Sequence, residues 1–153
     1  MNSYSEFGER TPLNHETPFW IRESEECFFV TVCCRKRGGE SLIEPGAAQS
    51  LLNSVRFRNE RRIWWCTAFV VMPDHVHGLI RFTGTGDMRS TIQNWKAWTA
   101  KSTGVSWQRD WFDHRLRGDQ SEREKANYLW QNPVRAGLVD DAEQWPWYFS
   151  ELR

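Results

Sequence analysis

Hydrophobic and polar residues alternate with two different periods along this chain, and each change of period marks the boundary of a predicted element. Short β-branched and aromatic runs predict strands over 27–34, 63–72, 75–82 and 111–117. Apolar residues three and four positions apart predict helices over 45–62, 88–102 and 121–131. This order predicts an α+β fold, an antiparallel sheet with helices mainly on one face, of ferredoxin-like or RNA-recognition-like type.

Turn and cap residues set the limits of these elements. Pro73-Asp74 separates the second and third predicted strands and implies an antiparallel pair. The segment 83–86 lacks the context of a phosphate-binding loop, so we interpret it as a connector. Ser121 is a plausible N-cap with Glu124 three residues later. The last helix should end near Asn132, because a residue that precedes proline avoids the α region.

Length and composition predict a single domain. We expect an N-terminal arm over 1–26, a folded domain over 27–147 and a short C-terminal tail over 148–153. Ten Trp and nine Phe against three Tyr favour a core built partly from large rings. The four cysteines show no Cys-x-x-Cys spacing, which predicts buried free thiols. With no secretory or membrane-spanning segment, we expect a cytoplasmic protein with no membrane partner.

The formal charge is zero, but its distribution is uneven. Residues 31–139 carry 17 basic and 10 acidic side chains, whereas both ends of the chain are acidic. A basic centre suits a face that binds a polyanion, although dispersed solvated charge is the alternative. The cations that would contact a nucleic-acid backbone are Arg35, Lys36, Arg37, Lys96, Lys101, Arg115 and Arg117.

Two histidines interrupt the apolar run that forms the third predicted strand. Because side chains alternate along a strand, His75 and His77 would point to one face and offer two imidazoles to one cation. We expect Val76 and Leu79 on the other face. The alternative is that the two histidines are only polar residues on a solvated sheet face.

A second candidate group lies in the last predicted helix. Tyr128 and Asn132 are four residues apart and therefore share one helix face. A tyrosine hydroxyl is a weak nucleophile at neutral pH and needs a cation or a base beside it. The Asn132 carboxamide could bind the same cation as the histidines. The alternatives are an aromatic side chain packed on the sheet for Tyr128 and a helix C-cap for Asn132.

Four segments, in order, resemble the REP-associated tyrosine transposases, which are single-tyrosine members of the HUH endonuclease superfamily. The segments are Met72-Pro73-Asp74-His75-Val76-His77, residues 92–101, Asp113-His114-Arg115-Leu116-Arg117 and residues 128–139. The resemblance spans roughly residues 27–147 and closes with Trp145-Pro146-Trp147. It implies an HUH fold over the folded domain.

The resemblance also implies a DNA strand transferase that cuts single-stranded DNA near an imperfect, REP-like hairpin. His75, His77 and Asn132 would bind Mg²⁺ or Mn²⁺, and Tyr128 would form a 5′-phosphotyrosine while releasing a 3′-hydroxyl. No nucleotide cofactor is implied, because the phosphotyrosine conserves the bond energy for rejoining. The protein would be nucleoid-associated and act as a monomer or homodimer.

Two features depart from the commonest pattern of that group. Asn132 stands where many single-tyrosine transposases have Gln, and Gly78 and Tyr148-Phe149-Ser150 also differ. Two other functions stay open from the residues alone. One is a non-catalytic module that binds single-stranded nucleic acid. The other is a zinc hydrolase that uses His75, His77 and a distant third ligand such as His114.

Overall fold

The computed structural model describes His15, Arg22 and residues 25–117 and 121–152. The predicted arm over 1–26 therefore lies almost entirely outside the described residues. The regular elements of the described chain are β1 (Phe28–Cys33), η2 (Ser41–Ile43), α1 (Pro45–Glu60), β2 (Trp65–Val71), β3 (His75–Arg81), α2 (Met88–Thr103), β4 (Phe112–Arg115), α3 (Glu122–Trp130), α4 (Asn132–Arg135), η3 (Ala142–Gln144) and β5 (Tyr148–Ser150).

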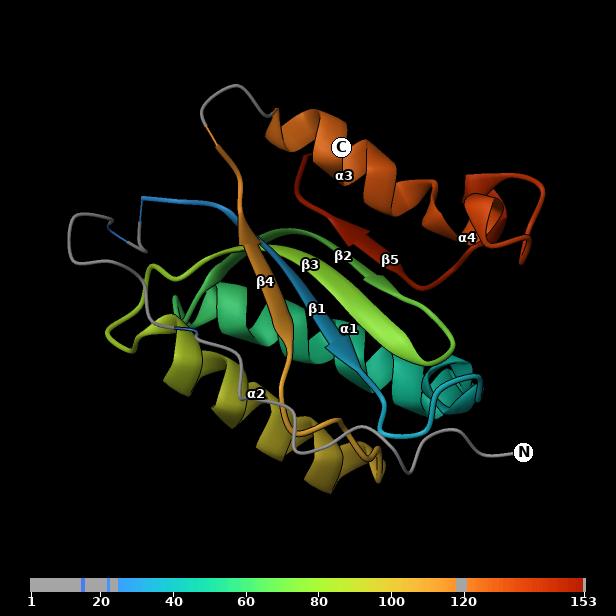
Figure 1. Cartoon of the computed structure of the whole chain (residues 1–153), viewed down its shortest axis with the longest axis horizontal. Helices are drawn as coiled ribbons and strands as arrows, with labels where there is room; N and C mark the ends of the chain where they lie inside the picture. Colours follow the sequence, from blue (N-terminus) through green and yellow to red (C-terminus); the bar gives the residue numbers. More distant parts are fainter. Residues whose placement is uncertain (1–14, 16–21, 23–24, 118–120, 153) are drawn as a thin grey trace, which may run out of the picture.

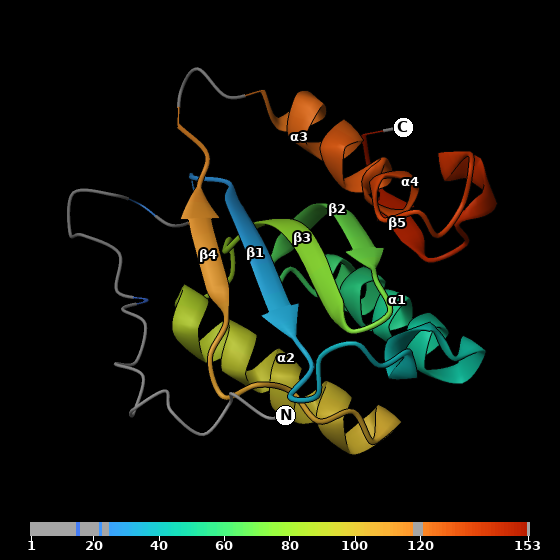
Figure 2. The ribbon, with the colours of Figure 1, turned by 45° about the vertical axis from the view of Figure 1, so that its right-hand side comes forward.

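The strands form one antiparallel sheet in the order β4-β1-β3-β2-β5 (Figure 1 and Figure 2). β2 and β3 form a hairpin around Pro73-Asp74, closed by a 2.8 Å hydrogen bond from the Met72 N–H to the His75 carbonyl. The elements from β1 to β4 follow the β-α-β-β-α-β order of a ferredoxin-like unit. The predicted α+β class and the predicted hairpin are confirmed.

Local sequence signals begin and end the helices. Pro45 is the first residue of α1, where its missing N–H costs no intrahelical bond. The Asp87 side chain accepts a hydrogen bond from the Ser90 N–H at the start of α2, and Gly104 ends that helix in the left-handed region, with φ of 77°. Ser121 caps α3 through the Glu124 N–H, as predicted.

The helices cover both faces of the sheet. In Figure 1, α1 and α2 lie on one side of the strands, and α3 lies on the other side. The prediction of helices mainly on one face therefore holds for α1 and α2, while α3 packs on the opposite face. Helical periodicity shows that a helix is amphipathic but not which face of a sheet it covers.

The larger core, under α1 and α2, includes the rings of Trp64, Trp95, Trp107 and Trp111. The smaller core, under α3, includes Ala68, Val70, Leu79, Ala126 and Leu129.

Both ends of the described chain dock on the sheet. β5 pairs with β2, with Phe149 opposite Phe69, so the predicted tail over 148–153 contains the last strand of the sheet. This strand is three residues long, which is too short for its period to be recognised in the sequence. At the other end, the His15 ring stacks on Trp111 with centroids 3.8 Å apart and hydrogen-bonds to Asp110 and Asp113.

All four cysteines, Cys27, Cys33, Cys34 and Cys66, are buried free thiols, as predicted. Burial raises the pKa of the Cys27 thiol to about 12 and raises the pKa of Cys66 even more. The thiols are therefore protonated and unreactive at neutral pH. Within the described residues, no helix has the length and apolar character needed to cross a membrane.

A bidentate ion pair between Arg81 and Glu122 anchors α3 to the sheet. Two nitrogens of the Arg81 guanidinium, at the end of β3, donate to the two carboxylate oxygens of Glu122, at 2.6 Å and 3.0 Å. The Thr67 hydroxyl donates to the same carboxylate at 2.8 Å. Burial alone would raise the pKa of Glu122, but the bonds from Arg81 and Thr67 outweigh it and lower that pKa. Glu122 therefore stays ionised and fixes the first turn of α3.

Glu122→Gln should lower the free energy of unfolding by about 1–3 kcal/mol, because it leaves the partly buried Arg81 charge without its carboxylate. The matched control is Glu124→Gln, since Glu124 is also acidic, lies in the same first turn and is exposed. Urea denaturation of both variants separates the ion pair from the helix-dipole effect that the two glutamates share. Equal destabilisation would contradict the anchoring role of Arg81–Glu122.

Candidate active site

β3 carries the two histidines at its start and the α3 anchor at its end. Its pairing with β1 is regular from His75, opposite Cys33, to Ile80, opposite Phe28. Strict alternation therefore places His75, His77, Leu79 and Arg81 together on the face that α3 covers. The expectation that Leu79 lies on the other face was wrong, because Leu79 has the same parity as the histidines and belongs to the smaller core. Gly78 keeps its place in this register.

Two hydrogen bonds orient the imidazoles. The Nδ1 atom of His75 lies 2.8 Å from the Asp74 carboxylate, and Nδ1 of His77 lies 2.8 Å from the Thr31 hydroxyl. The ring centroids are 4.6 Å apart, and the planes cross at 76°. Within the described chain, neither Nε2 atom has a hydrogen-bond partner. When Nδ1 carries the proton, each Nε2 keeps its lone pair. In metal-binding histidines, a hydrogen bond at one ring nitrogen commonly fixes this tautomer and leaves the other nitrogen free for the metal.

Both histidines are neutral at pH 7. Burial, with smaller contributions from the neighbouring His75 and from the positive charges of Arg37, Arg135 and Lys125, lowers the pKa of His77 to about 3. Burial also lowers the pKa of His75, although the Asp74 carboxylate opposes that shift. Neutral imidazoles are the form that binds a metal ion, so the pair needs no deprotonation to act as ligands near neutral pH.

Asp74 ties a basic loop to the histidine end of the sheet. Its second carboxylate oxygen accepts a hydrogen bond from the Gly38 N–H at 2.8 Å and forms an ion pair with Nε of Arg37 at 3.2 Å. Burial would raise the pKa of Asp74, but these contacts and the bond to His75 outweigh it and lower that pKa. Arg35, Lys36 and Arg37 are all exposed. The structure thus places three predicted DNA-contacting cations beside the histidine pair.

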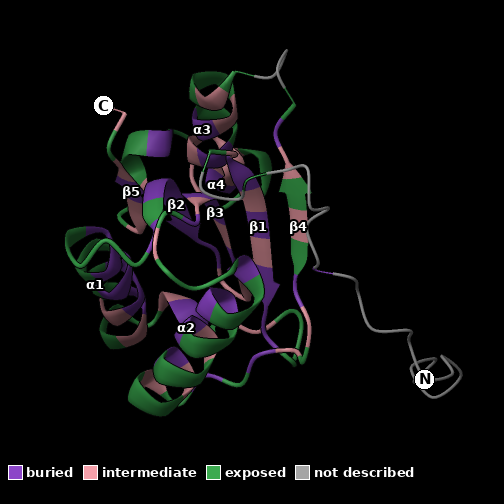
Figure 3. Ribbon diagram, turned by 90° about the vertical axis from the view of Figure 1, so that its left-hand side faces the viewer, coloured by how far each residue is buried: buried purple, intermediate pink, exposed green. Residues whose placement is uncertain are grey.

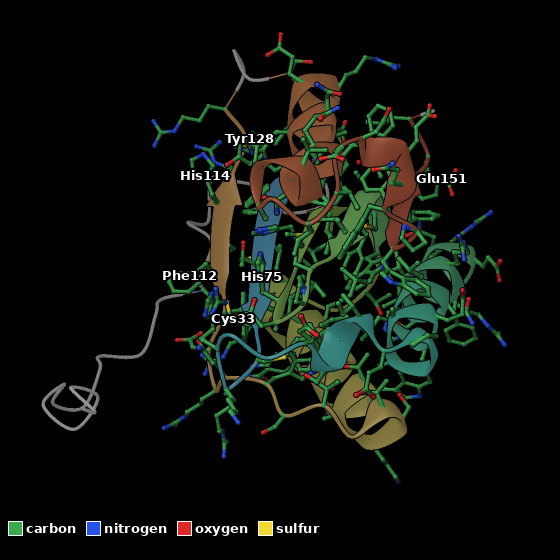
Figure 4. The ribbon with its side chains drawn as sticks, turned by 90° about the vertical axis from the view of Figure 1, so that its right-hand side faces the viewer. Cys33, His75, Phe112, His114, Tyr128 and Glu151 are labelled. Atoms are coloured by element: carbon green, nitrogen blue, oxygen red, sulfur yellow. The ribbon has the colours of Figure 1, made fainter. Side chains whose placement is uncertain are left out.

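Tyr128 lies on the same side of the sheet, between two cations. Its side chain is 47% exposed, with the Arg135 guanidinium 3.7 Å and the Lys125 ammonium 4.8 Å from the ring centroid. Lys125 is also 4.8 Å from the centroid of Phe29, whose ring lies 5.1 Å from His77. A continuous chain of contacts therefore links the histidine pair to Tyr128. Figure 4 shows Tyr128 and His75 with the other labelled side chains.

Asn132 lies where α3 gives way to α4. α3 ends at Trp130, and Asn132 is the first residue of α4, with Pro133 in the second position. The expectation that Asn132 avoids the helical region or caps α3 was wrong, because Gln131 forms the cap and a new helical turn begins immediately. Proline is tolerated in the first turn, where no intrahelical bond needs its N–H. Asn132 is half-buried.

β4 forms one edge of the sheet, and its residues are alternately exposed and intermediate (Figure 3). Cross-strand pairing places Phe112, Thr31 and His77 in one row across β4, β1 and β3. Phe112 is 52% exposed, and His114 is exposed in the next row. Neighbouring strands are about 4.8 Å apart, so Phe112 lies about 10 Å from His77. An exposed aromatic ring at that distance can stack on an unpaired base.

The remaining predicted DNA contacts lie elsewhere. Lys96 does not fit its predicted role, because its ammonium donates to the carbonyls of Gln108 and Arg109 at 2.7 Å and 2.8 Å. Lys96 therefore connects α2 to the loop before β4. Both lie on the face of the sheet opposite the histidines. Lys101 is exposed in the last turn of the same helix. Arg115 is half-buried with a nitrogen 3.6 Å from Glu26, and Arg117 is exposed after β4.

Sequence reasoning missed the residues that surround the candidate site residues. Lys125 precedes Tyr128 by three positions, and this spacing alone would have placed it on the same helix face. Asp74, which directly precedes His75, was interpreted only as a turn residue. Arg135 comes from a separate helical turn, so no periodicity connects it to Tyr128.

Among the residues that the structure describes, no three His, Cys, Asp or Glu side chains form a group that could hold a metal ion. His114 pairs opposite Phe29 on the neighbouring strand and does not join the histidine pair in such a group. The described residues therefore do not place His114 as the third ligand of a zinc site. Asn132 stays the candidate third ligand.

The fold is a ferredoxin-like sheet, extended by β5 and crossed by α3 on the face that carries the histidines. A solved structure of a REP-associated tyrosine transposase bound to a REP hairpin matches it with a TM-score of 0.72 and 24% identity, over 89% of this chain and 82% of that chain. This likeness confirms the fold.

The sequence comparison identifies the relatives. Over 122 residues, the chain is 27% identical to the REP-associated tyrosine transposase of Escherichia coli (strain K12), covering 78% of this chain and 73% of the relative. It is also 25% identical to an uncharacterised protein of Haemophilus influenzae over 150 residues, covering 72% of this chain and 82% of that relative. No protein-family model matches. The resemblance to REP-associated tyrosine transposases is confirmed.

The buried histidines predict a loss of stability in acid. Because the pKa of His77 is lower in the folded protein than in the unfolded chain, the unfolded chain binds more protons as pH falls below about 6.5. The free energy of unfolding should therefore be highest above that pH and fall by up to about 1.4 kcal/mol per pH unit for this residue. Urea denaturation of His77→Gln in EDTA should show a flatter decline between pH 6.5 and 5. An unchanged slope would show that His77 is not held neutral by burial.

Proposed function

We propose that this protein is a metal-dependent transposase that nicks and rejoins single-stranded DNA beside hairpin repeats of REP type. The observation that carries the proposal is the arrangement of two neutral, oriented imidazoles and a tyrosine flanked by cations on one face of the sheet. The relatives support the substrate class, since one of them is a REP-associated tyrosine transposase and the matching structure holds a REP hairpin.

The residues present fit a divalent cation such as Mg²⁺ or Mn²⁺. His75 and His77 would supply two Nε2 atoms, and the Asn132 amide oxygen would supply the third ligand. All three ligands are uncharged, so a bound ion would keep its full charge to polarise a phosphate and stabilise the leaving oxygen. Asp74 and Thr31 would hold the two rings in position through Nδ1.

Tyr128 would be the nucleophile. Its hydroxyl oxygen attacks the phosphorus, the bond from phosphorus to the 3′ oxygen breaks, and a 5′-phosphotyrosine and a free 3′-hydroxyl result. The tyrosine proton passes to water on the exposed side of the ring, and the departing 3′ oxygen takes a proton from water. Attack by a 3′-hydroxyl on the phosphotyrosine reverses the step, so rejoining needs no nucleotide cofactor.

The surrounding cations and the exposed β4 edge would position the DNA. Lys125 and Arg135 flank Tyr128, and Arg35, Lys36 and Arg37 lie at the histidine end, so phosphates on both sides of the cleavage site meet positive charge. Phe112 would stack on an unpaired base in the same cross-strand row as His77. This surface accepts single strands rather than a closed duplex.

The test is a denaturing gel that detects a covalent protein–DNA adduct formed with Mn²⁺ and single-stranded hairpin repeats from the flanks of the gene. Tyr128→Phe should abolish the adduct and keep DNA binding, because only the nucleophilic oxygen is lost. Tyr148→Phe is the matched control, since the Tyr148 hydroxyl donates to the Ala126 carbonyl in the same layer. It should form the adduct normally.

An adduct that persists in Tyr128→Phe would contradict the assignment of the nucleophile. Tight hairpin binding with no adduct in any variant would instead favour the non-catalytic binding module. His75→Ala with His77→Ala should remove the Mn²⁺-dependent adduct, and retention of that dependence would contradict the metal ligands.

The stacking role of Phe112 has its own test. Phe112→Ala should weaken binding of single-stranded DNA by about 1–3 kcal/mol, the usual range for one base stacked on an aromatic ring. Trp65→Ala is the control, because Trp65 is also exposed but lies at the start of β2, opposite Arg81, at the end of the sheet away from the histidines. Fluorescence anisotropy at fixed salt measures both. Equal losses in the two variants would contradict a specific role for Phe112.

A further inference from the structure

A second polar hollow lies at the far end of β3, away from the histidines. It has a volume of about 600 Å³ and lies between the C-terminal end of α1, the loop after β3 and the start of α2. We call it the arginine cleft. Its lining residues are Arg58, Arg61, Arg62, Ile63, Thr83, Gly84, Thr85, Gly86, Ser90, Thr91 and Asn94.

The cleft gathers positive charge without a counter-charge. Three guanidinium groups line it and no carboxylate does. In the described part of the chain, none of Arg58, Arg61 and Arg62 makes a salt bridge, whereas Arg37, Arg81 and Arg115 each pair with a carboxylate. Asp87 is close in sequence, but its side chain caps α2 through Ser90 and does not line the cleft.

Arg58 is the most buried of the three arginines, with only 8% of the residue exposed, and burial is unusual for a charged side chain. Among the described residues its guanidinium donates one hydrogen bond, 3.3 Å long, to the Ser54 carbonyl, and it lies 5.3 Å from the centre of the Trp98 ring. An arginine has five N–H donors, so most of them are left for the cleft. Burial lowers the pKa of Arg58, and a buried cation without an anion is costly. An anion in the cleft would remove this cost.

The loop after β3 gives the cleft a defined wall. A side chain at Gly84 would come within 2.5 Å of the Ile63 carbonyl oxygen, so the loop packs against the turn that carries Arg62. Arg62 itself has φ of 58°, a left-handed conformation that fixes the direction in which the chain leaves α1. Thr83 and Thr85, which carry hydroxyl groups, border the same space. These are donors of the kind that phosphate oxygens accept.

We propose that the arginine cleft binds a backbone phosphate of the DNA, outside the segment held at the histidine pair. The length of β3 alone separates the two sites by about 20 Å, which is about six nucleotides of a B-form strand. The cleft lies on the α1–α2 side of the sheet and the histidines lie on the α3 side, so a strand that reaches both passes around the end of the sheet. A single nucleotide cannot span both sites, whereas a hairpin with its flanking strand can. The inference rests on the proposed function only in taking DNA as the partner, and it needs neither the metal nor Tyr128.

The test compares Arg61→Gln with Arg56→Gln. Both arginines are exposed on α1, and each lies over a phenylalanine ring, at 5.3 Å for Arg61 over Phe57 and 5.4 Å for Arg56 over Phe149. Only Arg61 lines the cleft. Arg62→Asn is a second variant, because asparagine tolerates the left-handed backbone of that position. Anisotropy is measured in EDTA in the Tyr128→Phe background, so that failure of the nicking reaction cannot affect the result.

Arg61→Gln and Arg62→Asn should each weaken binding of a long hairpin by about tenfold and reduce the slope of log affinity against log salt by about 1. Arg56→Gln should change neither, and a three-nucleotide strand, which is too short to reach from the histidine pair to the cleft, should bind all variants equally. Equal effects of Arg61→Gln and Arg56→Gln would overturn the proposal. The proposal would also be overturned if inorganic phosphate bound to the unmodified protein and not to Arg61→Gln, while the hairpin affinity of Arg61→Gln was unchanged. The ligand of the cleft would then be free phosphate and not DNA.

Discussion

The Arg81–Glu122 ion pair is the contact on which the arrangement of the candidate active site depends. α3 follows β4 in the chain. The sheet face beneath it is apolar where it contributes to the smaller core, and apolar packing alone would not fix where α3 lies along that face. The pair fixes its first turn at the end of β3, and the Tyr148 hydroxyl bonds to the Ala126 carbonyl further along. α3 then runs toward the histidine end, where Lys125 contacts both the Tyr128 ring and the Phe29 ring beside His77. Because strand alternation places Arg81 on the same face as His75 and His77, one strand provides both the anchor and the metal ligands.

Charge is arranged differently at the two ends of this strand. At the histidine end, Asp74 balances Arg37 and orients His75, so the local cations are held in place while the imidazoles stay neutral. At the other end, the arginine cleft gathers three cations with no carboxylate among its lining residues. The net formal charge of zero does not reveal this difference, because acidic residues near the chain ends offset the basic residues of the centre. A substrate with regularly spaced phosphates can use both ends at once.

Periodicity and turn chemistry predicted most of the fold. The hairpin at Pro73-Asp74, the Ser121 cap and the shared face of His75 and His77 all follow from local sequence. β5 could not be predicted, because a three-residue edge strand is defined by its pairing with β2 and not by its own pattern. Packing also decided the place of α3, the helical state of Asn132 before Pro133, and the use of Lys96 to hold two carbonyls. The arginine cleft joins residues from 58 to 94, so it exists only once the chain has folded.

The central claim is that one divalent cation binds the histidine pair and the DNA phosphate together. The most direct measurement is pulsed electron paramagnetic resonance of Mn²⁺ bound to the Tyr128→Phe protein with an uncleaved single-stranded hairpin. We expect hyperfine couplings from imidazole nitrogen and from phosphorus on the same ion, and loss of the nitrogen couplings in His75→Ala with His77→Ala. A phosphorus coupling without nitrogen would show that Mn²⁺ reaches the DNA independently of these histidines, which would contradict the claim.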